Sequence, residues 1–236
     1  MIMELNQYIN EAFPGLVIKP SLYWQWKSSI HFNLAMELSP FKDGIDKLNP
    51  QYFKETYEKA ILYFNELFSD DDEIFLVTNY YHHKKQRISR HKLKVYAHYI
   101  KNKDIKFRLQ QKICPYVFEE EEEAKDYCTS QFSLLCRKRD IRYPLLLEAI
   151  CNQDFPPLKP NLRHRDSVYS PNVFFINASK DIIFFIYDDR GCEVIAKDFE
   201  TIRPLYEKYT EWVEGHRQEE QYKGDMINEI KDQAMD

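Results

Sequence analysis

The sequence contains little glycine and many large aromatic side chains. Only 5 of its 236 residues are glycine, whereas 17 are Tyr and 16 are Phe. Phosphate-binding and dinucleotide-binding loops need several glycines at fixed spacing, and neither motif occurs, so these two classes of nucleotide-binding protein are excluded. Few glycines and many bulky side chains indicate tightly packed elements joined by short connections.

The chain also lacks a secretory signal and a membrane-spanning run. Its first 15 residues contain no basic stretch followed by an apolar one, and no apolar run approaches the roughly 20 residues that cross a bilayer. The five cysteines are odd in number and form no C-x-x-C pair, which favours free thiols over a disulfide framework or a structural zinc site. We therefore expect a cytoplasmic protein without a membrane partner, a bound metal or a cofactor.

The apolar pattern of the chain predicts one α+β domain. Hydrophobic residues make up 44% and charged residues 30% of the sequence, proportions typical of a folded globular protein. Strands are expected at 28–34, 73–80, 107–116, 129–137, 173–176, 181–187 and 192–197, and helices at 50–68, 89–101, 144–152 and from Thr201 onward. We predict a mixed, mainly antiparallel sheet with flanking helices, ending in a three-stranded meander plus helix. This single domain covers residues 1–214, and a polar, frayed helical tail covers 215–236.

Two details of this prediction are specific. The strand at 181–187 is apolar on both faces, so both of its faces are expected to be covered. Pro204 is costly inside a helix, so the last helix is expected to begin at Thr201, which places Pro204 in its first turn.

Several segments resemble a known family. The run F-F-I-N-A-S-K-D-I-I-F-F-I-Y-D-D-R-G-C-E-V-I-A-K-D at 174–198, followed by R-P-L-Y-E-K-Y at 203–209, resembles an uncharacterised bacterial family, domain-of-unknown-function family 3885, found mainly in bacilli and their relatives. The segment A-I-C-N-Q-D at 149–154 is similar as well. The resemblance implies a bacterial, intracellular protein. Because no activity is established for the family, the resemblance implies no catalytic residues.

The turn Asp188-Asp189-Arg190-Gly191 between two predicted strands is the first candidate site. Its two carboxylates suit a metal ion or a basic partner, and Arg190 suits a phosphate or a carboxylate. Asp and Gly are also the residues that tight turns require, and glycine tolerates a positive φ. The favoured interpretation is therefore a structural turn in which Arg190 pairs with a neighbouring Asp.

A nuclease-type metal site at Asp189, Glu193 and Lys197 is not favoured. Such sites hold their metal through an acidic residue and a lysine separated by one position on the strand that follows the first Asp. Here three residues separate Glu193 from Lys197, and the apolar Ile195 is one of them. We expect a solvent-facing ion pair between Glu193 and Lys197 on an outer strand.

The second candidate site is a basic segment at 82–108, which holds ten Lys or Arg against one Asp, a local balance of +9. The cations are Lys84, Lys85, Arg87, Arg90, Lys92, Lys94, Lys101, Lys103, Lys106 and Arg108. Cations interleaved with stacking rings, here Tyr80, Tyr81, Tyr96 and Tyr99, are what nucleic-acid binding requires. The first four cations, Lys84, Lys85, Arg87 and Arg90, are the candidate binding residues. A solvated helix face compensated by the acidic run at 119–123 is the favoured alternative.

The histidines and most of the cysteines show no catalytic or metal-binding motif. The histidines of the basic segment lack the i, i+4 spacing of metal ligands on one helix, so they are expected on a solvated face. They are His82, His83, His91 and His98. No partner at a fixed local spacing exists for Cys128, Cys136 or Cys192.

Three classes of function stay open. The preferred one is a non-catalytic protein-interaction protein, such as an immunity protein that blocks a toxin through complementary charge. The second is a nucleic-acid-binding module that uses residues 84–108. The third is an enzyme, without a recognisable catalytic motif, whose polar site lies near the Y-D-D-R-G hairpin.

Overall fold

The computed structural model describes residues 3–42, 47–86, 88, 93–118, 122–163 and 169–214. Within them, seven strands form one sheet in the order β1-β7-β6-β5-β2-β4-β3, and every neighbouring pair is antiparallel. The strands are β1 (Ser29–Asn33), β2 (Glu73–His83), β3 (Gln110–Cys114), β4 (Tyr127–Arg137), β5 (Asn172–Asn177), β6 (Ile182–Ile186) and β7 (Gly191–Ala196). The α-helices are α1 (Leu5–Ala12), α2 (Pro50–Leu67), α3 (Lys94–Tyr99), α4 (Tyr143–Cys151) and α5 (Phe199–Lys208). Short 3-10 turns are η2 (Lys103–Arg108), η3 (Glu122–Asp126), η4 (Lys138–Asp140) and η5 (Thr210–Trp212).

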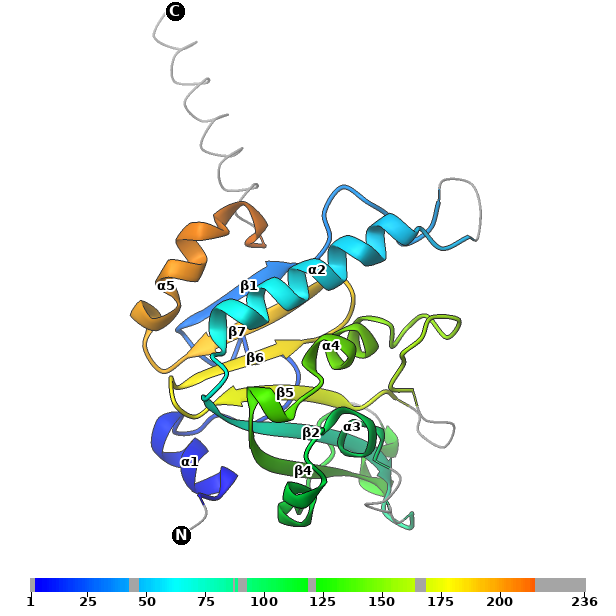
Figure 1. Ribbon diagram of the computed structural model, residues 1–236. Helices are drawn as coiled ribbons and strands as arrows, with labels where there is room; N and C mark the ends of the chain where they lie inside the picture. The colour runs from blue at the N-terminus through cyan, green and yellow to red at the C-terminus, as the bar shows by residue number, and fades with distance from the viewer. Residues whose placement is uncertain are drawn as a thin grey trace, which may run out of the picture.

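Helices cover both faces of this sheet, in agreement with the predicted α+β fold with flanking helices. The helices α2, α3, α4 and α5 pack on one face around a large core, and α1 packs with the loop that follows it on the other face (Figure 1). The strand β6 lies between the two cores. Ile182, Phe184 and Ile186 join the first core, and Ile183 and Phe185 join the second. The prediction that both faces of this strand are covered is confirmed.

The long helix α2 forms where the sequence predicted it. Asn49 caps it, because its side-chain oxygen accepts a hydrogen bond of 3.2 Å from the backbone N–H of Gln51. Pro50 occupies the first turn, where its missing N–H is not needed. Phe64 lies at the centre of the apolar stripe and stacks on Phe68 with ring centroids 4.4 Å apart.

Several predicted element boundaries were wrong, and three of them are the following. The last helix begins at Phe199 rather than Thr201, because the Asp198 side chain accepts from the backbone N–H of Glu200 and caps the helix there. Pro204 therefore lies inside α5. The strand predicted from 107 begins only at Gln110, because η2 occupies the preceding residues. The helix predicted at 89–101 is the short α3, and residues 89–92 lie outside the described part of the chain.

The helix α1 was not predicted, although its buried residues have the spacing of one helix face. The predicted tail at 215–236 lies outside the described residues. Across the part of the chain that the structure describes, no helix combines the length and the apolar character that crossing a membrane demands.

Candidate functional site

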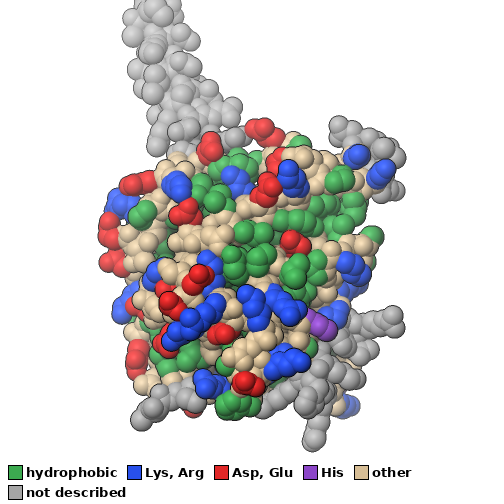
Figure 2. All heavy atoms as spheres, viewed as in Figure 1, with side chains coloured by type: hydrophobic (Ala, Val, Ile, Leu, Met, Phe, Trp, Pro, Cys, Tyr) green, Lys and Arg blue, Asp and Glu red, His purple; other side chains and the backbone are tan. Residues whose placement is uncertain are grey.

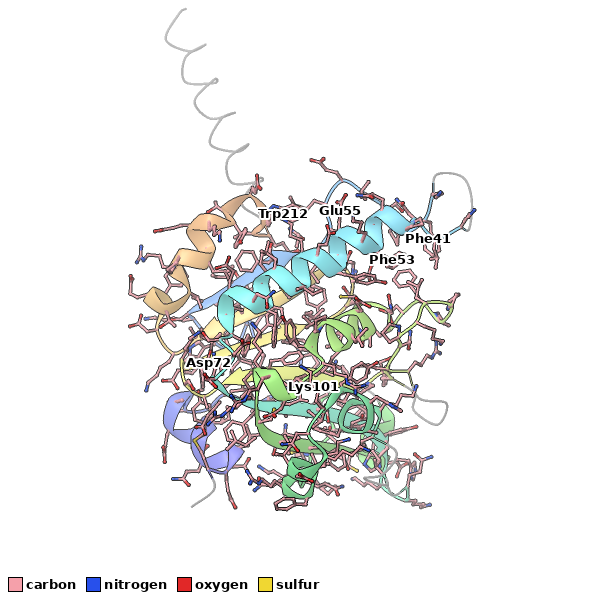
Figure 3. All side chains as sticks on the ribbon, viewed as in Figure 1. Phe41, Phe53, Glu55, Asp72, Lys101 and Trp212 are labelled. Carbon is pink, nitrogen blue, oxygen red and sulfur yellow. The ribbon has the colours of Figure 1, made fainter. Side chains whose placement is uncertain are left out.

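Two segments that carry the family resemblance meet at one end of the sheet. The A-I-C-N-Q-D segment ends α4, and the Y-D-D-R-G segment is the turn between β6 and β7. The Gln153 side-chain amide donates a 2.5 Å hydrogen bond to the Tyr187 carbonyl and ties the two segments together. Phe155 follows directly and packs edge-on against Phe53 at the start of α2, with ring centroids 4.8 Å apart. Figure 3 shows Phe53 beside Phe41 at this end of α2.

The outer half of this turn is closed by its own residues. Asp188 accepts from the backbone N–H of Arg190 at 2.8 Å and from the guanidinium Nε of Arg190 at 2.8 Å. The same contact raises the pKa of the Arg190 guanidinium above its ordinary value. Arg190 therefore pairs with a neighbouring Asp, which is the interpretation that was favoured from the sequence. The Arg190 side chain is nevertheless 74% exposed, so one side of the guanidinium faces solvent.

The inner half of the turn points into the protein. Asp189 is buried, and its carboxylate accepts a hydrogen bond from the hydroxyl of Tyr52 in α2. Burial raises the pKa of the Asp189 carboxyl above its ordinary value; the Tyr52 hydrogen bond opposes this shift and the neighbouring Asp188 adds to it. Asp154 lies at the exposed rim, and one oxygen from each of the three Asp residues lies within 4.8 Å of the others. We call Tyr52, Asp154, Asp188, Asp189 and Arg190 the hairpin cluster.

The hairpin cluster could offer three carboxylate oxygens to a hard cation such as Mg²⁺ or Ca²⁺. Two of its members already have partners, because Tyr52 donates to Asp189 and Arg190 donates to Asp188. A group of carboxylates satisfied in this way explains the turn without a metal ion.

Gly191 is required for a reason that differs from the prediction. Its φ is not positive. Instead, a Cβ at this position would lie 2.1 Å from the Tyr187 hydroxyl oxygen and 2.8 Å from the carbonyl oxygen of Phe32 in β1. The close approach of the Tyr187 ring and of β1 leaves no room for a side chain.

The expected ion pair between Glu193 and Lys197 was wrong. Glu193 is buried, because β7 is an inner strand, and its carboxylate accepts from the backbone N–H of Leu22 at 2.8 Å. Lys197 lies beyond the end of β7 and pairs with Asp181 at 3.7 Å. Glu193 therefore holds the loop after α1, and it takes no part in the hairpin cluster.

The structure describes only part of the basic segment. Lys84 and Lys85 are exposed at the end of β2, and the Lys84 ammonium donates to the carbonyl of Lys125 at 2.5 Å. Arg87 and Arg90 lie outside the described residues. All four tyrosines that interleave with the cations, Tyr80, Tyr81, Tyr96 and Tyr99, are buried. They belong to the interior of the protein, so they cannot stack on bases.

A different group of cations gathers near α3 and α4. An isolated antiparallel bridge joins Ile100 to Ile141, and the backbone N–H of Arg142 donates to the Tyr99 carbonyl at 2.7 Å. In this register Lys101 lies opposite Asp140, whose carbonyl accepts from the Lys101 backbone N–H at 2.8 Å, so the segment after α3 runs beside the start of α4. Figure 2 shows Lys and Arg side chains over α3 and the start of α4, and Figure 3 shows Lys101 on the sheet face that carries α2 and α4.

We call Lys101, Lys103, Lys106 and Arg142 the α3–α4 basic face. Partial burial lowers the pKa of Lys106, and the nearby positive charges of Lys103 and Arg142 lower it further, so these charges lie close enough to repel one another. Within the described residues, no carboxylate forms an ion pair with any of the four. Phe107 lies in the same segment with 78% of its surface exposed.

Sequence reasoning also missed a histidine–cysteine pair. His82 was expected on a solvated face, but it lies buried in β2, with its Nε2 2.8 Å from the Ser130 hydroxyl and 3.6 Å from the Cys128 sulfur. Cys128 and His82 are cross-strand neighbours in β4 and β2. Burial raises the pKa of the Cys128 thiol, and the nearby Lys84 lowers it. Because the partners are 46 positions apart, no local motif could have revealed the pair.

The seven-stranded antiparallel sheet and the helices packed on it define an α+β protein. Residues 5–217 match the family described as "Domain of unknown function (DUF3885)", and the chain belongs to this family. It is similar to "Uncharacterized protein YnaE" of Bacillus subtilis (strain 168), with 49% identity over 215 residues that cover 91% of this chain and 99% of the relative. No solved structure matches the chain. The family resemblance inferred from the sequence is confirmed.

Proposed function

We propose that this protein is a non-catalytic interaction protein that binds an acidic surface of a partner protein through the α3–α4 basic face. The observation that carries the proposal is the group Lys101, Lys103, Lys106 and Arg142. Lys103 and Arg142 lie close enough to Lys106 to lower its pKa, and none of the four forms an ion pair with a carboxylate among the described residues. Uncompensated like charges repel one another, and an acidic partner removes that repulsion on binding. Complementary charge also accelerates association and excludes partners of the wrong sign.

The backbone around these cations supports a rigid binding surface. The bridge between Ile100 and Ile141 fixes α3 against the start of α4, and both isoleucines are buried. The Lys106 ammonium donates to the Ala97 carbonyl at 3.1 Å, which limits its movement without neutralising its charge. Cations held in place lose little conformational entropy when a partner binds.

Exposed apolar side chains beside the cations favour a protein partner. Phe107 is 78% exposed in η2, and Leu145 is 47% exposed in the first turns of α4. Protein interfaces commonly combine such apolar anchors with a charged rim. An immunity protein that blocks an acidic toxin surface is one member of this class, and the five free cysteines fit a cytoplasmic protein.

Nucleic-acid binding is the second candidate, and the same four cations would carry it by contacting phosphates. We rank it lower because the four tyrosines assigned to base stacking are buried. An enzyme site at the hairpin cluster ranks third, because Tyr52 and Arg190 already satisfy the carboxylates of Asp189 and Asp188.

The proposal is tested with the full chain, tagged and incubated with a native Bacillus subtilis lysate, with and without nuclease treatment. The test variant carries Lys101→Glu, Lys103→Glu, Lys106→Glu and Arg142→Glu. The matched control reverses four cations on other surfaces, Lys54, Lys197, Arg203 and Lys208. We expect a stoichiometric protein that survives nuclease, is lost with the test variant and is kept by the control.

Two results would contradict the proposal. Recovery of nucleic acid that depends on the same four cations would favour nucleic-acid binding over a protein partner. A partner protein retained by the test variant would show that another surface binds it.

A further inference from the structure

A pocket of about 360 Å³ lies between α1 and the strands β2, β4 and β3. It is on the sheet face opposite to α2 and α4, so it is separate from the α3–α4 basic face. Its volume falls within the range of small-molecule sites, which is about 300 to 1,000 Å³.

Three polar residues lie side by side across the strands beneath this pocket. The sheet register aligns Asn79 of β2 with Gln131 of β4, and Gln131 with Lys112 of β3. The Gln131 amide nitrogen donates to the Asn79 side-chain oxygen at 3.0 Å, and the Asn79 amide nitrogen donates to the Ile18 carbonyl at 2.8 Å. Along β2 on the same face, the residues before Asn79 are apolar core residues, Phe75 and Val77. Along β2, the apolar core on this face therefore gives way to a polar residue at Asn79, where the pocket lies.

These contacts leave polar atoms of the pocket unpaired. The one side-chain hydrogen bond of Gln131, to Asn79, uses its amide nitrogen, so its side-chain oxygen accepts no hydrogen bond from the described residues. Thr129 also lines the pocket, and its buried hydroxyl has no partner in the described part of the chain. Buried polar groups of native proteins nearly always have a partner, and a bound molecule or water supplies it where the protein does not.

The opposite wall of the pocket is apolar. Leu5 and Ile9 project from α1, and Leu16 and Ile18 project from the loop that follows it. Aliphatic side chains on one side and amides on the other are the usual combination in a site for a small amphipathic molecule.

The charge of the pocket selects the sign of its ligand. Lys19 and Lys112 line it, and among the described residues no Asp or Glu does. Lys112 donates to the Asn6 side-chain oxygen at 3.0 Å, a neutral partner that leaves its charge uncompensated. Glu4 lines a neighbouring hollow that shares Lys112 and Gln131, but it does not line the pocket itself.

From these observations we infer that the pocket under α1 binds a small organic carboxylate with an aliphatic chain. The carboxylate lies against Lys112 and Lys19, where its acceptor oxygens match the ammonium donors. The aliphatic chain lies against Leu5, Ile9 and Leu16. This inference is independent of the proposed protein interaction, because it uses neither the same residues nor the same face of the sheet.

The test is isothermal titration calorimetry of the full chain with three probes that share one aliphatic chain. These probes are octanoate, n-octanol and octylammonium. We expect octanoate to bind in a one-to-one ratio, n-octanol to bind more weakly, and octylammonium not to bind. Loss of a charge-assisted hydrogen bond weakens binding by about tenfold or more, so Lys112→Met should reduce the octanoate affinity by at least that factor.

A pair of matched tryptophan variants separates the pocket from unspecific apolar binding. Asn10 is exposed on α1 and lines the pocket, so Asn10→Trp should fill it and abolish octanoate binding. Gln7 is exposed on the same helix and does not line the pocket, so Gln7→Trp should leave binding unchanged. Absence of octanoate binding at millimolar concentration would overturn the inference. Equal binding by Asn10→Trp and Gln7→Trp, or by octanoate and octylammonium, would overturn it as well.

Discussion

The Tyr52 hydroxyl donates a hydrogen bond to the Asp189 carboxylate, although 137 positions separate the two residues in the chain. The contact joins the first turns of α2 to the turn between β6 and β7. It also provides a donor for a buried carboxylate, which would otherwise be costly to remove from water. This single hydrogen bond fixes the hairpin cluster to the main helix of the fold.

Removal of the Tyr52 hydroxyl should therefore destabilise the protein. Tyr52→Phe leaves Asp189 buried without this donor, which typically costs about 1–3 kcal/mol. We expect a loss of this size in urea unfolding monitored by tryptophan fluorescence. Tyr206→Phe, at a half-buried position in α5, is the control and should change stability by less than about 0.5 kcal/mol. Equal effects of the two substitutions would contradict the structural role of the Tyr52–Asp189 contact.

The pKa of Asp189 gives a prediction for the pH dependence of stability. Because its pKa is raised above the ordinary 3.8 in the folded state, the folded protein holds the proton more tightly than the unfolded chain does. The contribution of Asp189 to stability therefore falls as pH rises from about 4 through the raised pKa, and it stays low above that value. Asp189→Asn keeps the shape and the acceptor for Tyr52 and removes this dependence.

The stability of Asp189→Asn relative to the natural protein should therefore increase between acid and neutral pH. Thermal unfolding of both proteins across this range measures the difference. Asp181→Asn, which changes an Asp in the turn before β6, is the control. A difference for Asp189→Asn that shrinks as pH rises would show that the carboxylate is stabilised in its charged form.

Gly191 gives a prediction that depends on space alone. An added methyl group would overlap the Tyr187 hydroxyl and the Phe32 carbonyl, and such overpacking costs about 1–3 kcal/mol. We expect Gly191→Ala to lower the free energy of unfolding by this amount. Gly15→Ala is an informative comparison, because Gly15 has φ +85° and no atom within 4 Å of an added Cβ, so only backbone strain opposes it. Normal stability of Gly191→Ala would show that β1 and Tyr187 are free to move away.

The cysteines should differ in reactivity according to their burial. Cys136, Cys151 and Cys192 are buried, and burial raises the pKa of each thiol. Cys114 is half-buried and should react first with iodoacetamide. Cys128 should react slowly at pH 7, because burial raises the pKa of its thiol despite the nearby Lys84. Labelling followed by peptide mass spectrometry measures each rate, and fast labelling of Cys128 would indicate a thiolate activated by His82.

The sequence predicted most of the fold because its strongest signals are local. The Asn49 cap, the alternating apolar positions of β1 and the doubly apolar β6 each require only neighbouring residues to be recognised. The prediction was weaker where a single side chain decides a boundary. Asp198 starts α5 two residues early, because its side chain caps the helix at the Glu200 N–H although Pro204 then lies inside the helix.

The candidate sites were less predictable because they depend on contacts between distant positions. The Tyr52–Asp189, His82–Cys128 and Tyr99–Arg142 neighbours come from distant parts of the chain, and no spacing in the sequence links them. At Tyr96 the error was of the other kind, because a local pattern suggested a binding role that the fold does not allow. Its place beside cations suggested base stacking, but its hydroxyl donates to the Leu76 carbonyl at 3.1 Å in the interior.

The most direct test of the proposed interaction is zero-length carbodiimide cross-linking of the complex recovered from lysate, followed by mass spectrometry. This reagent joins a lysine amine to a carboxylate only where the two groups touch. We predict cross-links from Lys101, Lys103 and Lys106 to Asp or Glu residues of the partner protein. Cross-links that avoid these lysines and come from other surfaces would contradict binding through the α3–α4 basic face.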